Sequence, residues 1–203
     1  MLAKTKWVID SVKSRINFEI EHFILPNIKG TFKTFDATVY SINNDFTKDE
    51  INFLISSGSL NTNDTYCEEH LKSANVFDVE NHKQIVFKGR IVEKLNRKGN
   101  YVLLGELTIK GITKRIEFAV KFLGLKKSIF GNEKVNFTST GIINRNDWGL
   151  NFNDDLEAWQ ILVNDKIKIN CELQLKRSTI QDLELPFERR LEQKTVENYA
   201  LPV

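Results

Sequence analysis

Apolar and polar residues alternate along most of the chain, and the pattern is clearest between residues 103 and 122. Every second residue from Leu103 to Ile109 is apolar or glycine, which is the period of a β-strand with one buried face. Lys110-Gly111 then interrupts the run, and glycine tolerates the positive φ of a tight turn. A second alternating run follows at once, made of Ile112, Ile116, Phe118, Val120 and Phe122. The pattern predicts two antiparallel strands joined by a minimal turn.

The other periodic segments are also strand-like. Within residues 15–22 the apolar side chains and His22 share one face, and charged or amide side chains take the other. Further strands are expected at about 7–10, 30–39, 51–55, 84–91, 135–143 and 166–176. Many antiparallel strands with one apolar face form a sandwich or a barrel. About eight strands is the number at which a barrel can hold one small apolar ligand. We therefore expect an all-β fold, an eight-stranded antiparallel barrel.

Two stretches depart from the strand period. Residues 61–64 supply helix-capping side chains, and Glu68 and Glu69 fall in the turns that follow, which predicts a short helix near 64–79. In the tail, Pro186 at a first helical position predicts a short C-terminal helix. A solvated, partly disordered tail fits the same composition. We divide the chain into a barrel, 1–177, and a C-terminal extension, 178–203.

Composition and charge exclude some partners. The chain is 41% hydrophobic and 28% charged with a formal net charge of +2, which is ordinary for a soluble domain. The sequence has no block of Lys or Arg, so nucleic-acid binding is not expected. It also has no run of 18 apolar residues, so a membrane-spanning helix is not expected. The first residues lack the apolar core of a signal peptide, so the expected location is cytoplasmic as given, or periplasmic if a leader was removed. The 14 phenylalanines fit either a packed core or the aromatic wall of a pocket.

Reactive side chains are few and scattered. Cys171 lies in an alternating strand run far from Cys67, which favours a buried free thiol over a disulfide. The three histidines show no metal-ligand spacing, so no metal is expected. No nucleophile motif and no paired carboxylates are readable, so we predict no catalytic residue, no enzyme activity and no cofactor.

Several stretches, taken in order, carry a resemblance to a known family. They are Trp7–Asp10, Ser14–His22, Gly30–Phe32, Ser59–Thr62, His70–Ser73, Phe77-Asp78, Ile85–Phe87, Gly105–Lys114 and Ile143–Leu150. Together they resemble the YceI-like family over about residues 4–177. The resemblance implies a lipocalin-like barrel that binds, sequesters or transports a polyisoprenoid or an isoprenoid quinone without catalysis. It also implies a homodimer.

Three features depart from the family pattern. Cys67-Glu68 stands where the family usually shows Arg-Asp, which removes an arginine that could hold a polar head group or the helix. The secretory leader of many relatives is absent from the sequence as given. The tail after Arg177 extends beyond the usual family end.

The residues expected to face the ligand combine inward strand positions with one loop. They are Phe18, Ile20, His22, Phe32, Phe53, Phe87, Leu107, Phe118, Phe137, Arg145 and Trp148. His22 ends its strand and is either a hydrogen-bonded core histidine or a donor to the polar end of the ligand. Arg145 lies beside Asp147 and Trp148. Two roles fit this position. In the first, Arg145 fixes the barrel mouth by pairing with a carboxylate or stacking on the indole; in the second, it binds a phosphate or a quinone oxygen of the ligand.

Two other functions stay open at this point. The barrel could be packed solid, with the C-terminal tail docking a partner in an interaction or scaffold role. An enzyme on the same barrel would require a cluster of titratable groups in the cavity, and His22 is the one such residue that the strand pattern places inside.

Overall fold

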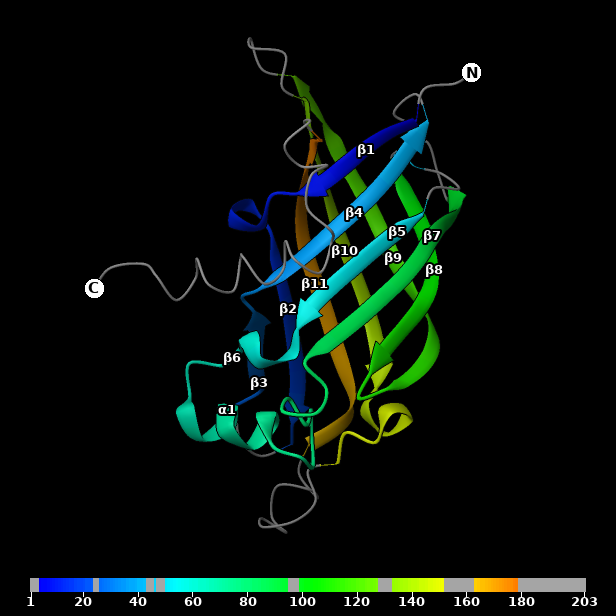
Figure 1. Ribbon diagram of the computed structural model, residues 1–203. Helices are drawn as coiled ribbons and strands as arrows, with labels where there is room; N and C mark the ends of the chain where they lie inside the picture. Colours follow the sequence, from blue (N-terminus) through cyan, green and yellow to red (C-terminus); the bar gives the residue numbers. More distant parts are fainter. Residues whose placement is uncertain are drawn as a thin grey trace, which may run out of the picture.

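The computed structural model describes residues 4–23, 26–42, 46, 50–94, 99–127, 133–151 and 163–178. Within them, eleven strands belong to one antiparallel sheet that carries one α-helix and three short 3-10 turns (Figure 1). The elements are β1 (Lys4–Ile9), η1 (Ser11–Lys13), β2 (Arg15–His22), β3 (Ile28–Phe32), β4 (Phe35–Ile42), β5 (Ile51–Ser56), η2 (Ser57–Ser59), β6 (Leu60–Asn61), α1 (Thr65–Lys72), β7 (Gln84–Lys94), β8 (Asn100–Ile109), β9 (Ile112–Lys127), β10 (Glu133–Asn144), η3 (Arg145–Trp148) and β11 (Val163–Arg177).

The sheet closes into a barrel, which confirms the predicted fold class. Eight strands form the ring in the order β1-β4-β5-β7-β8-β9-β10-β11, and β11 returns to pair with β1. Strand β11 is long enough to pair with β1 near Leu175 and with β2 from Val163 to Glu172. β1 and β2 therefore follow one another along β11. β3 pairs with β2, and β6 pairs with β3, so these strands extend the wall beyond β4 and β5.

The hairpin predicted at Lys110-Gly111 is present. Lys110 and Gly111 both have positive φ, 52° and 74°, and join β8 to β9 as a two-residue turn. The single strand expected over residues 30–39 is wrong, because β3 and β4 are separate. Lys33 and Thr34 leave the ladder, and Lys33 N donates to Ser59 O at 3.0 Å.

The predicted helical stretch is confirmed as α1 followed by turns through Phe77. Asp64 caps α1 by accepting a hydrogen bond from Cys67 N at 3.0 Å. Leu71 is buried and anchors the helix to the barrel interior, beside β3 and β6 (Figure 1). No helix in the described ranges is long and apolar enough to cross a membrane. The helix predicted in the C-terminal extension lies outside the described residues.

A candidate ligand-binding cavity

The barrel is hollow. It contains a cavity of about 150 Å³ with an apolar wall, and apolar cavities in proteins stay dry and bind hydrocarbon. Its wall is apolar apart from Asn17, Ser139 and the thiol of Cys171, and contains no Asp, Glu, Lys, Arg or His among the described residues. Such a space excludes ions and accepts hydrocarbon.

The cavity is elongated along the strands. On β11, alternate residues from Ile167 to Leu175 line it. At about 3.3 Å per residue this is roughly 26 Å of strand, or about 20 Å along the axis at the usual strand tilt. The lining residues therefore extend along most of the barrel axis, so the cavity is long and narrow.

Phenylalanine rings that lie over glycines keep the cavity open. Phe18 covers Gly30, Phe87 covers the paired Gly89 and Gly105, and Phe118 covers Gly141. A Cβ at any of these glycines would lie closer than 3.0 Å to the ring that covers it, a separation that real Cβ atoms essentially never show. The rings can therefore lie along the wall, instead of projecting into the lumen.

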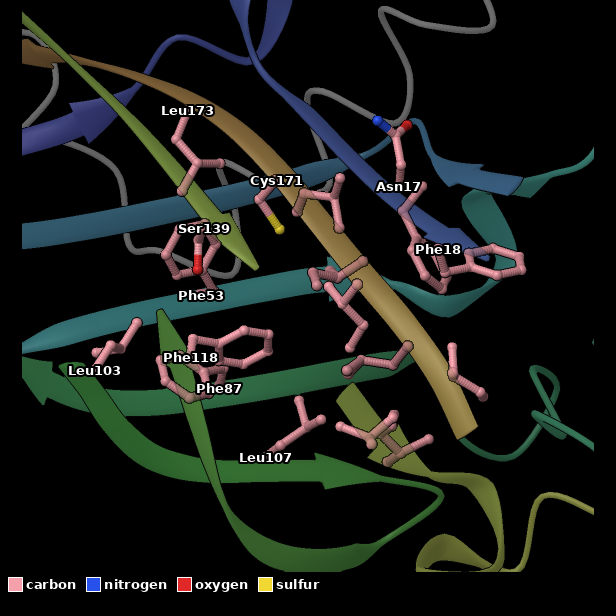
Figure 2. A pocket seen from close by; sticks show the side chains of 18 of the residues that line it. Asn17, Phe18, Phe53, Phe87, Leu103, Leu107, Phe118, Ser139, Cys171 and Leu173 are labelled. Carbon is pink, nitrogen blue, oxygen red and sulfur yellow. The ribbon is translucent and has the colours of Figure 1, made fainter. Parts of the chain in front are cut away.

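The structure brings most of the predicted ligand-facing residues to this cavity. Those that line it are Phe18, Ile20, Phe32, Phe53, Phe87, Leu107, Phe118 and Phe137. They come from β2, β3, β5, β7, β8, β9 and β10 and surround the lumen. Figure 2 shows several of them with Leu103 and Leu173. Their contact with a ligand stays a prediction.

His22 is buried, as its strand parity predicts, but it is not part of the cavity wall. On β2 the last residue of the wall is Ile20, and His22 lies beyond it, paired with Val163 of β11. Its backbone N–H donates to Asn27 Oδ1 at 3.3 Å. This placement favours a core histidine over a ligand donor.

Arg145 and Trp148 also lie outside the cavity wall. The guanidinium of Arg145 is buried, with Nη2 2.8 Å from Asp165 Oδ1 and Nη1 donating to Leu150 O at 3.3 Å. The indole N–H of Trp148 donates to Leu107 O at 3.2 Å. Of the two alternatives for Arg145, the structure supports the carboxylate pair, with Asp165 as the partner in place of the adjacent Asp147. These contacts fix η3 to β8 and β11.

The polar groups of the wall are residues that the predicted site omits. Cys171 is a free thiol, as expected, and burial raises its pKa to about 12. Ser139 faces it from β10 and is 7% exposed. The alternation of Phe137, Ser139 and Gly141 already places this serine inward, so the sequence carried the signal. Among the described residues, no group of three or more His, Cys, Asp or Glu could hold a metal ion.

Comparisons with known proteins agree with this architecture. The model of the YceI-like domain matches residues 7–175. A UPF0312 protein of Staphylococcus aureus strain N315 is 31% identical over 175 residues, which cover 86% of this chain and 99% of the relative.

Two solved structures share the fold at low sequence identity. BcnA of Burkholderia cenocepacia is 20% identical with a TM-score of 0.70, covering 82% of this chain and 98% of its own. A polyisoprenoid binding domain from Saccharophagus degradans, described as implicated in plant cell wall breakdown, is 14% identical with a TM-score of 0.63. The match covers 88% of this chain and 100% of that domain.

Proposed function

We propose that this chain, which belongs to the YceI-like family, binds a long uncharged amphiphile inside its barrel without catalysing a reaction. A polyisoprenoid or an isoprenoid quinone, sequestered or carried, is the ligand class that fits. The observation that carries the proposal is a hollow, elongated cavity whose described wall holds no charged side chain. The description of the Saccharophagus degradans protein as a polyisoprenoid binding domain is consistent with it.

Apolar contact would supply most of the affinity. Burying hydrocarbon contributes about 25 cal/mol per Å² before the costs of association. A few polar groups then set the orientation of the ligand. A phosphate head group would have to shed its water without a cationic partner in the described wall, which is expensive. The ligand is therefore a neutral molecule.

The alternatives are less well supported. A scaffold role with a solidly packed barrel conflicts with the cavity, and the tail that would dock a partner lies outside the described residues. An enzyme would need a nucleophile or a base in the lumen. The candidate there is Cys171, and burial holds its pKa so high that its reactive thiolate form is scarce at neutral pH.

Native mass spectrometry of the purified protein, with organic extraction of the bound material, tests the proposal. A matched pair of variants sharpens it: Leu103 lines the cavity, whereas Leu104 is 42% exposed on the same strand. We expect Leu103→Trp to abolish lipid retention and Leu104→Trp to preserve it. If wild-type protein stays lipid-free after incubation with polyisoprenoid-containing vesicles, the proposal is wrong.

A further inference from the structure

Two polar side chains meet halfway along the apolar wall. Ser139 of β10 and Cys171 of β11 are direct cross-strand partners, so their Cβ atoms lie about 5 Å apart. Both line the cavity, and Figure 2 shows them side by side with the thiol directed into the lumen. The amide of Asn17, the third polar residue of the wall, points away from this pair in the same view.

The hydroxyl of Ser139 opens onto the cavity. The residue is 7% exposed, and its Oγ makes no hydrogen bond to any described residue, Cys171 included. Buried hydroxyls in native proteins are nearly always hydrogen-bonded, and burial without a partner is costly. A serine in this position, directed into the cavity, is a hydrogen-bond donor that a polar atom of a bound ligand can meet.

We propose that Ser139 and Cys171 form a polar subsite that binds one uncharged oxygen of the ligand, a carbonyl oxygen in particular. The inference rests on the proposed function, and it identifies an uncharged oxygen as the ligand group that the protein recognises. Ser139 donates the stronger hydrogen bond, and the thiol is a weak second donor. The raised pKa of Cys171 keeps this thiol protonated and uncharged.

The position of the subsite restricts the ligand further. On β11, Leu173 and Leu175 line the wall on one side of Cys171, and Ile167 and Ile169 line it on the other. The bound oxygen therefore has hydrocarbon on both sides. A prenylated quinone meets this requirement, because its carbonyl carbon belongs to a ring that bears the isoprenoid tail on one side and other apolar substituents on the other. A lipid that ends in a strongly hydrated head group does not.

The test uses two probes that differ by one group: farnesylacetone, an isoprenoid ketone, and the hydrocarbon in which a methylene replaces its carbonyl. We expect the wild-type protein to bind the ketone three- to tenfold more tightly, the effect of about one neutral hydrogen bond. Ser139→Ala should abolish this preference and leave hydrocarbon binding unchanged. Val120→Ala, which shortens an apolar wall residue opposite Ser139 on β9, is the control and should weaken both probes alike.

A second measurement needs no variant. Saturating ketone should shift the S–H stretching band of Cys171 in the infrared spectrum, whereas the hydrocarbon should not, and the band of Cys67 on α1 should stay unchanged. Equal wild-type affinity for both probes, an unchanged preference in Ser139→Ala, or an unshifted Cys171 band would overturn the subsite and leave the proposed function standing. Binding of neither probe by the wild type would overturn both.

Discussion

Gly141→Ala is the substitution that tests most directly how the barrel stays hollow. The added methyl group would meet Cδ1 and Cε1 of Phe118 at less than 3.0 Å and no other atom that closely. Gly141 is not among the glycines with positive φ, so alanine is compatible with the backbone. The conflict therefore falls on the Phe118 ring, which has to swing away from β10 into the lumen.

The expected magnitude follows from overpacking. Forcing one extra methyl group into a packed site costs about 1–3 kcal/mol. In a chain of this size each kcal/mol lowers Tm by about 2–4 °C, so we expect Gly141→Ala to lower Tm by about 5 °C. Phe118 lines the cavity of about 150 Å³, so its displaced ring would take space that a ligand occupies. The displaced ring should therefore also remove most of the lipid that the wild-type protein retains.

Calorimetry and lipid extraction on the same preparations provide the readouts. Gly58→Ala is the matched control, because a Cβ there meets nothing within 4 Å, and it should change neither Tm nor lipid content. The double variant Gly141→Ala/Phe118→Leu should regain lipid retention, since the smaller side chain leaves room for the methyl group. Wild-type Tm and lipid content in Gly141→Ala would refute the account of rings lying over glycines.

Three further predictions follow from the same structure. His22→Leu should leave lipid retention unchanged, because His22 is outside the cavity wall. Ile20→Ala changes a residue of the wall and should reduce lipid retention. Organic extraction of the lipid from both purified variants tests this pair. Burial raises the pKa of Glu68, but hydrogen bonds from Thr62 N, Lys72 and Asn63 N outweigh it, so the pKa lies below its ordinary value of 4.5. The ionised carboxylate thus stabilises the fold above pH 4.5, and this contribution is lost as pH falls through the lowered pKa. Glu68→Gln should cost about 1 kcal/mol at pH 7 and nothing in acid, and equal deficits at both pH values in thermal melts would contradict this. We also propose, from the family resemblance, that the chain is a homodimer, against which a clean monomer at micromolar concentration in sedimentation would count.

Local patterns were enough to predict the barrel and the one α-helix found in the described residues. Alternation identifies strands because each strand buries one face, and the capping side chain Asp64 identifies α1 because it satisfies a free N–H at the helix start. The break between β3 and β4 was also readable. Phe32 and Phe35 are both buried but lie three residues apart, which a continuous strand of period two cannot accommodate.

The details of the site depend on contacts between distant residues, and sequence patterns do not contain them. Parity places His22 on the inner face but does not say how far along the axis the cavity extends. Arg145 pairs with Asp165, twenty positions away across a connection, although Asp147 is closer in sequence. The ring of Phe87 lies over Gly105 because β7 and β8 pair in one particular register.

The two uses considered for the many phenylalanines both occur in this barrel. Phe35 is 2% exposed and lies outside the cavity wall, as a core aromatic does. Phe87 and Phe118 meet edge to face at 5.9 Å, yet each lies over glycine and still faces the lumen. The barrel thus buries aromatic surface for stability without filling its interior.

A lumen built in this way favours binding. Side chains around a void lack contact partners on one side and lose dispersion energy. A ligand of matching shape restores those contacts, and because the wall is already formed, little of the gain is spent on reorganisation. Binding to the folded state alone then stabilises the protein in proportion to the logarithm of ligand concentration. The hollow interior therefore links lipid content to the thermal stability of the chain.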